Sequence, residues 1–266
     1  MPVALILLLL LGACASTPEP TGNLAEPSPA PAVVPLAVLE IERESATHTS
    51  SSTLARSVEG SPIELRTFGD GPARVLLIGL IHGSEPEGYE QFESLWDTIA
   101  TDETARRATL HAIPSMNPDG HGRGSRYNVN GIDLNRNWPA SNFSPSRRRG
   151  DRPLSEPETA AVHAHLESFA PDLLIVFHSI SSGPFVDPDG PALGAGAAFV
   201  AAAAEVDPRW RLLPDFTNPA GSLGSYAGLD RGIPTLTIEF DRGQDAALAR
   251  EAAAAGVLAA IASLGR

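Results

Sequence analysis

The sequence predicts a single α/β domain with a mixed, mostly parallel central sheet flanked by helices on both faces. Three observations support this fold class. Short apolar runs of strand length alternate with longer stretches in which apolar residues have helical spacing. Most of these runs are apolar throughout, which is typical of strands buried on both faces. Residues 54–266 also provide enough chain for one substantial core.

The expected elements follow one another as strand and helix. Strands are expected at residues 74–81, 109–116, 173–177 and 235–240, and helices at residues 87–100, 155–169, 192–205 and 245–264. Ser155 and Glu158 have the spacing of a capping box, which predicts the start of the second helix. The Gly, Asn and Pro-rich loop at 117–139 is too long for a simple connection, and long ordered loops tend to carry function.

The chain before this domain has the composition of a targeting segment and a tether. Residues 3–11 are continuously apolar but too short to span a membrane, so residues 1–13 are interpreted as a signal peptide. The sequence Leu-Gly-Ala-Cys that ends at Cys14 resembles the lipobox of bacterial lipoproteins. We therefore expect a lipidated N-terminus and Pro-rich linker at residues 14–53. Ser16 favours an outer-membrane anchor in the cell envelope, facing the periplasm.

Composition excludes several classes of chemistry. The formal net charge of −13 argues against a nucleic-acid partner. All 19 basic residues are Arg, so mechanisms that need a lysine amine are excluded. Cys14 is the single cysteine, so a multi-cysteine zinc site is impossible. Any metal must be held by His, Asp or Glu.

Three residues of these types stand at the ends of predicted strands. His82 and His178 each follow a buried run, and Glu239 lies near the end of another. In open α/β sheets, ligands bind in the crevice beyond the carboxyl ends of the strands. Together with Glu85, the two imidazoles would leave the fourth position of a tetrahedral zinc open, as in catalytic sites. A His-x-x-Glu pair alone is more often a pair of ordinary polar residues on the surface or in the core. A buried apolar strand, however, does not end on a charged or metal-binding side chain unless a partner lies nearby.

The remaining histidines look unsuitable for the site. His163 and His165 are two residues apart on a helix and cannot face one site, so they are interpreted as exposed. His111 and His121 have no partner that the sequence suggests. His48 lies outside the predicted domain.

From about residue 55 to the C-terminus, the sequence resembles the zinc carboxypeptidase family, and within it the bacterial murein peptide amidase-like branch. The motifs that support the resemblance occur in the family's order. They are Ser57-Val58-Glu59-Gly60, His82-Gly83-Ser84-Glu85, Asp133-Leu134-Asn135-Arg136-Asn137-Trp138-Pro139, the stretch at 153–159, Phe177-His178-Ser179 and Thr237-Ile238-Glu239.

The resemblance implies a role for each matching residue. One Zn²⁺ per chain would be held by His82, Glu85 and His178. Glu239 would be the general base that takes a proton from the attacking water and returns it to the leaving amine. The alternative for Glu239 is a strand-end carboxylate paired with Arg242 or Arg231.

Other matches concern the substrate. Arg126 would stabilise the developing oxyanion, with Arg123 as its rival. Asn135 and Arg136 would hold the substrate's terminal carboxylate, which a guanidinium can bind in a bidentate manner. Asp133 would orient His82 through its other ring nitrogen, unless it only caps a helix or turn.

Two expectations concern the walls of the substrate pocket. Tyr226 is the candidate for the family's mobile-loop tyrosine, although it stands closer to Glu239 than in the digestive enzymes. The segment 221–224 resembles the lining of the specificity pocket, and Leu223 there would suit an apolar side chain. The murein branch instead points to diaminopimelate, which is polar.

The resemblance therefore predicts a zinc-dependent hydrolase that removes a C-terminal residue from a short peptide. The favoured bond joins D-Glu to diaminopimelate in cell-wall fragments. The alternatives are a general metallocarboxypeptidase, an N-acyl amino acid deacylase and a non-catalytic cell-wall-binding lipoprotein. The expected partners are the peptide substrate and, through the lipid on Cys14, a membrane. The sequence does not specify an oligomeric state.

Overall fold

The computed structural model describes residues 49–265. The predicted signal peptide, the lipidated Cys14 and most of the predicted linker lie outside the described residues and stay predictions. The described part is built on one eight-stranded sheet with the strand order β1-β2-β4-β3-β5-β8-β6-β7. The pairs β3–β4, β3–β5, β5–β8 and β6–β7 are parallel, and the other three pairs are antiparallel. The sheet is therefore mixed and mostly parallel, as the sequence predicts.

The elements have the following bounds. The strands are β1 Ser50–Arg56, β2 Pro62–Phe68, β3 Ala73–Ile78, β4 Ala108–Ile113, β5 Leu173–Ile180, β6 Phe185–Asp189, β7 Arg211–Leu212 and β8 Thr235–Asp241. The α-helices are α1 Glu87–Ile99, α2 Pro118–Gly122, α3 Pro157–Phe169, α4 Leu193–Val206 and α5 Ala246–Ser263. Short helices are η2 Ala105–Arg107, η3 Leu134–Arg136 and the π-helix η4 Gly224–Asp230. Every predicted strand and helix is present.

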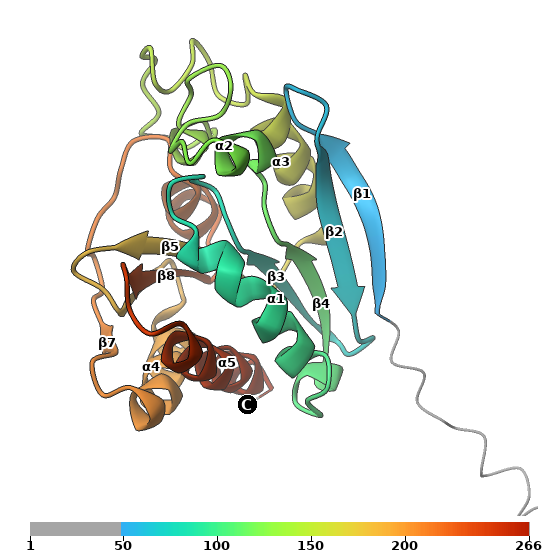
Figure 1. Ribbon diagram of the computed structural model, residues 1–266, viewed down its shortest axis with the longest axis vertical. Coiled ribbons are helices and arrows are strands. Elements are labelled where there is room, and N and C mark those ends of the chain that lie inside the picture. Colours follow the sequence, from blue (N-terminus) through green and yellow to red (C-terminus); the bar gives the residue numbers. More distant parts are fainter. Residues whose placement is uncertain (1–48, 266) are drawn as a thin grey trace, which may run out of the picture. The chain divides into compact units, whose positions relative to one another are not determined.

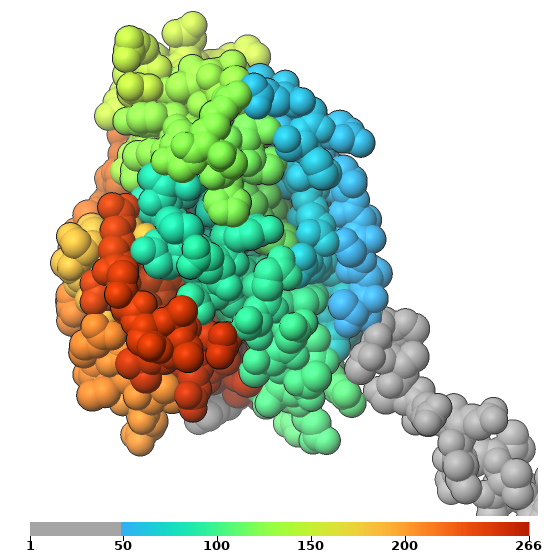
Figure 2. All heavy atoms as spheres, in the orientation of Figure 1, coloured from blue at the N-terminus to red at the C-terminus, as the bar shows by residue number. Residues whose placement is uncertain are grey.

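Two hydrophobic cores lie on opposite faces of the sheet. On one face, residues of α1, α4 and α5 pack against alternate strand residues such as Leu77, Ile175 and Ile238. On the other, α3 and the loops pack against the intervening residues, among them Leu76 and Val176. Figure 1 shows α1, α4 and α5 together along one side, and Figure 2 shows α1 beside α5 at the surface. The prediction of helices on both faces is confirmed.

Helix α5 is the one helix among the described residues that is long and apolar enough to cross a membrane. It packs against α4 and α1, and the buried side of α5 belongs to the first core. Its composition is therefore that of a core helix of this domain.

The strands β1 and β2 were not predicted, and the fold begins before residue 54. Strand β1 starts at Ser50 and pairs antiparallel with β2 along its length. Its side chains are mostly exposed, and backbone hydrogen bonds to β2 hold the segment. Only its end contributes apolar contacts, where Leu54 and Ala55 pack against the second core. An edge strand of this kind has the same polar composition as a linker, so the sequence does not distinguish β1, which starts at Ser50, from the linker predicted at residues 14–53.

The predicted capping box is also wrong, although the helix starts where it was expected. Glu156 is the N-cap residue of α3 and makes no side-chain cap hydrogen bond. Glu158 is fully buried, and its Oε1 accepts a hydrogen bond from the backbone N–H of Val58 at 3.0 Å. Its Oε2 accepts one from Asn128 Nδ2 at 3.2 Å. The carboxylate therefore ties the β1–β2 turn and the long loop to α3.

His111 and His165 form a contact that the sequence did not suggest. Nδ1 of His111 on β4 lies 3.0 Å from Nε2 of His165 on α3, and the His111 ring stacks on Phe169 with a centroid separation of 3.8 Å. Both imidazoles, like that of His163, are partly buried rather than exposed. Burial, together with the neighbouring His165, lowers the pKa of His111 to about 4.

This pair predicts a loss of stability in acid. A histidine whose folded-state pKa lies below its ordinary value of 6.5 is protonated more readily in the unfolded chain, so folding stability falls as the pH drops from 6.5 towards 4. The imidazole is half-exposed, so we expect about 1 to 2 kcal/mol after allowance for solvent screening. In urea titrations at pH 7 and pH 4.5, His111→Phe should lose less stability than the wild type. Equal losses would contradict this account.

Candidate active site

Three side chains converge beyond the central strands. The Nδ1 atoms of His82 and His178 lie 3.0 Å and 2.9 Å from Oε2 of Glu85. All three side chains are buried, and one ligand atom from each lies within 4.8 Å of the others. Burial alone would raise the pKa of Glu85, but hydrogen bonds with His178 and His82 outweigh it and hold this pKa well below its ordinary value. The carboxylate is therefore charged, as metal ligation requires.

The local chain path explains how these ligands meet. His178 lies within β5, in register with Glu239 on β8. His82 and Glu85 stand in a tight turn after β3, closed by a hydrogen bond from the Glu85 N–H to the His82 carbonyl at 3.0 Å. A Cβ on the intervening Gly83 would lie 2.1 Å from the backbone of Gly120, so only glycine allows the turn to approach α2 this closely.

The donor set fits a zinc ion. Two imidazole nitrogens and one carboxylate oxygen are the ligands of several catalytic zinc sites. Zinc bonds of about 2.1 Å in tetrahedral directions place ligand atoms about 3.4 Å apart, so each imidazole nitrogen needs to move only about 0.5 Å from Oε2 of Glu85. The other metal-ligand positions of such a site stay open for water and substrate.

Asp133 and Arg126 contact the ligands directly. Oδ1 of Asp133 lies 2.9 Å from Nε2 of His82, the ring nitrogen opposite the one that faces Glu85. The same oxygen accepts a hydrogen bond from the N–H of Asn135, so Asp133 also caps η3. Arg126 donates from Nε to Asp133 and from Nη1 to Glu85, both at 3.0 Å. Its rival Arg123 pairs instead with the exposed Glu59 and does not line the pocket.

Glu239 and Arg242 line the cavity beside the three metal-ligand candidates. Burial raises the pKa of Glu239, and the negative charge of Glu85 adds to the rise, whereas the neighbouring His178 opposes it. Glu239 makes no salt bridge with Arg242 or Arg231, so the alternative of a paired strand-end carboxylate fails. Nη2 of Arg242 lies 3.5 Å from Oε1 of Glu85, and Arg231 pairs with Glu167.

Asn135 and Arg136 reach the pocket from η3. Nδ2 of Asn135 lies 3.2 Å from Nε2 of His178, and its Oδ1 accepts the N–H of Leu223 at 2.9 Å. Arg136 is partly buried, and this burial lowers the pKa of its guanidinium, although the charge of Asp133 opposes the shift. Both side chains line the same cavity as the three metal-ligand candidates.

Two of the predicted pocket residues lie elsewhere. The Leu223 side chain is 1% exposed and belongs to the second core, while its neighbours Ser222 and Gly224 line the pocket. The Tyr226 hydroxyl lies 2.8 Å from Nε2 of His163 and is also bonded to Glu167 and Arg231. Both side chains point into the second core, Tyr226 from the π-helix η4 and Leu223 from its N-cap position, and no pattern in the sequence predicts this helix.

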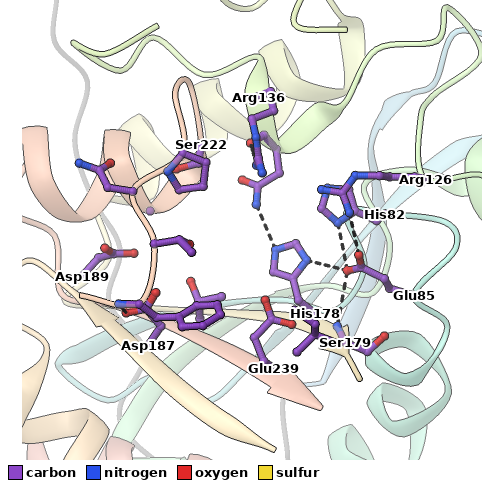
Figure 3. Close-up of a pocket in the computed structure, with 18 of the residues that line it drawn as sticks. His82, Glu85, Arg126, Arg136, His178, Ser179, Asp187, Asp189, Ser222 and Glu239 are labelled. Carbon is purple, nitrogen blue, oxygen red and sulfur yellow. Dashed lines mark hydrogen bonds and ion pairs between the residues drawn. The ribbon is translucent and has the colours of Figure 1, made fainter. Parts of the chain in front are cut away.

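The cavity has a volume of about 640 Å³ and contains residues that the sequence analysis did not select. They include Ser179, Asp187, Asp189, Phe216 and Arg242. Figure 3 shows Asp187 and Asp189 on the opposite side of His178 and Glu239 from Arg126 and Glu85. The pocket therefore has a basic, metal-ligating side and an acidic side.

Comparison with known proteins agrees with this geometry. The model of the family described as zinc carboxypeptidase matches residues 38–187, more than half of the chain. The chain belongs to the zinc carboxypeptidase family. Murein peptide amidase A of Escherichia coli K12 is 31% identical over 209 residues, which cover 70% of this chain and 78% of that protein. Carboxypeptidase SOL1 of Arabidopsis thaliana is 35% identical over 124 residues, 41% of this chain but only 25% of the plant protein.

Solved structures of family members share the fold. A metallo-carboxypeptidase from Burkholderia cenocepacia has a TM-score of 0.62 at 25% identity, covering 86% of this chain and 66% of that one. The murein-tripeptide amidase MpaA from Escherichia coli O157 has a TM-score of 0.60 at 26% identity, covering 81% and 91%. The protein is thus a zinc metallohydrolase of this family, related to murein peptide amidase, and its His-Glu-His cluster can bind the metal.

Proposed function

We propose that this zinc carboxypeptidase-family hydrolase removes the C-terminal residue of short cell-wall peptides, by cleaving the amide bond between D-Glu and diaminopimelate. The main support is the likeness to murein peptide amidase A, which extends over most of both chains. The pocket supplies the groups that such a cleavage needs, and its acidic wall suits a polar leaving residue.

Each residue at the catalytic end has a separate role in the proposed cleavage. His82, Glu85 and His178 would hold the zinc, and zinc, when bound, polarises the scissile carbonyl and acidifies its water. Glu239 accepts the proton of the attacking water and returns it to the leaving nitrogen, for which a raised pKa is an advantage. Arg126 stabilises the negative charge that develops on the carbonyl oxygen.

Residues of η3 bind the terminal carboxylate of the substrate. Arg136 lines the cavity with a guanidinium that can bind a carboxylate through two parallel hydrogen bonds. Asn135, held by the N–H of Leu223, adds a second polar contact. These residues restrict cleavage to the last residue of a peptide. The lipid anchor predicted at Cys14 would keep the domain beside the cell wall, which membrane fractionation of the full chain would test.

The substrate is tested with matched peptides. We expect the zinc-loaded protein to release diaminopimelate from L-Ala-γ-D-Glu-diaminopimelate, detected by mass spectrometry, faster than it releases Leu or Phe from plain peptides. Faster turnover of the plain peptides would favour a general metallocarboxypeptidase. Inactivity on every peptide with zinc bound would contradict the proposal and favour a deacylase or a binding lipoprotein.

A further inference from the structure

The lining of the catalytic cavity includes three arginines, and the proposed cleavage uses only two of them. Arg126 donates to Glu85 at 3.0 Å, and Arg136 lies on η3. The third, Arg242, directly follows β8, on which Glu239 lies. The Arg242 side chain is 47% exposed, and its one side-chain hydrogen bond to a described residue spans 3.5 Å, to Oε1 of Glu85. Most of the donors of this guanidinium are therefore available to a ligand in the cavity.

Glu85 does not require Arg242 as a partner. Its Oε2 lies 3.0 Å and 2.9 Å from the imidazoles of His82 and His178, and its Oε1 accepts a hydrogen bond from Arg126 at 3.0 Å. Each of these contacts is shorter than the one to Arg242. A contact of 3.5 Å from a half-exposed guanidinium contributes little to stability. A structural ion pair with Glu85 therefore does not account for an arginine at this place in the cavity.

The side of the site next to Arg242 is not the side that holds the terminal carboxylate of the substrate. Asn135 of η3 contacts Nε2 of the His178 imidazole, whereas Glu85 contacts its Nδ1. In Figure 3, Arg136 lies above His178 and Glu85 lies to the right of it. A peptide that binds Arg136 through its terminal carboxylate has its scissile carbonyl at the metal-ligand candidates. The part of the peptide before that carbonyl therefore extends past Glu85 towards Arg242.

We infer that Arg242 forms a subsite for a free carboxylate on the acyl residue, which is the residue whose carbonyl is cleaved. This inference rests on the proposed function and names a determinant of its substrate class. In a γ-linked D-Glu, three carbons join the free α-carboxylate to the scissile carbonyl, so the two carbonyl carbons lie up to about 5 Å apart. A guanidinium hydrogen bond of about 3 Å spans the rest of the way to Arg242. An acyl residue without a side carboxylate cannot make this contact, so Arg242 selects peptides with an acidic acyl residue.

The test uses two peptides that differ in one group on the acyl residue: L-Ala-γ-D-Glu-diaminopimelate, and the same peptide with the α-carboxylate of D-Glu replaced by a carboxamide. The zinc-loaded wild type should prefer the carboxylate peptide at least about tenfold in kcat/KM. Arg242→Gln should reduce this preference to below about twofold, mainly by raising KM for the carboxylate peptide. Arg242→Lys keeps the charge and should retain part of the preference. The matched control is Arg209→Gln, which should retain all of it, because Arg209 pairs with Asp207 and Asp241 outside the pocket lining.

Binding of the dipeptide product separates this inference from the proposed function. Calorimetric titration of the zinc-loaded protein should show tighter binding of L-Ala-D-Glu than of its α-carboxamide, with the difference lost in Arg242→Gln. No carboxylate preference in the wild type, or an unchanged preference in Arg242→Gln, would overturn the subsite. Equal losses on both tripeptides in Arg242→Gln would also overturn it, because they would show that Arg242 acts through Glu85. Arg242-dependent binding of L-Ala-D-Glu without turnover of either tripeptide would uphold the subsite and overturn the proposed function.

Discussion

Replacing Glu239 by glutamine is expected to lower kcat at least about 1000-fold and to leave one zinc ion bound per chain. Glutamine keeps the size and polarity of the side chain but cannot accept a proton from the attacking water. Glu239 is not a member of the His-Glu-His cluster, so the metal should stay. Mass spectrometry of the released residue gives kcat, and atomic emission after dialysis gives the zinc content.

The matched control is Asp241→Asn, which removes a carboxylate two residues further along β8. Asp241 pairs with Arg209 and does not line the pocket, so kcat should stay within about twofold of the wild type. A Glu239→Gln protein with wild-type turnover would rule out Glu239 as the general base.

Replacing His82 by alanine is expected to abolish turnover and to weaken zinc binding at least about 100-fold. The substitution removes one of the three ligands and leaves Asp133 without the imidazole that it contacts. Zinc stabilises a protein that binds it only when folded, so added zinc should raise the Tm of the wild type but not of His82→Ala. Thermal scans with and without zinc measure this difference.

His121→Ala serves as the control for loss of an imidazole. The His121 ring packs against Tyr89 at a tilted angle, outside the pocket lining, so the zinc-dependent rise in Tm should persist in that variant. The same zinc affinity in His82→Ala and in the wild type would show that His82 is not a ligand.

The central sheet and the catalytic end were predictable because their causes are local in the sequence. Fully apolar runs mark strands buried on both faces, and parallel strands bring their carboxyl ends to one edge. The sequence alone therefore places His82 and His178 at the same edge of the sheet. The register of β5 and β8 brings His178 opposite Glu239, as the shared edge implies.

The acidic wall could not be predicted because its strand has no strand signal. Strand β6 has the sequence Phe-Val-Asp-Pro-Asp, which is short and contains a proline, a residue typical of edges and loops. It pairs antiparallel with β8, and only that pairing turns Asp187 and Asp189 towards the pocket. The prediction that Leu223 lines the pocket is wrong for a related reason. The direction of each side chain in the segment 221–224 depends on the π-helix that follows it.

The central claim is that a zinc-dependent site removes the C-terminal residue of a peptide, and one assay tests it most directly. Two versions of L-Ala-γ-D-Glu-diaminopimelate, one with a free terminal carboxylate and one with that carboxylate amidated, are incubated with the protein after chelation and after zinc is restored. We predict release of diaminopimelate only from the free form and only with zinc. Release without zinc, or equal cleavage of the amidated peptide, would contradict the account.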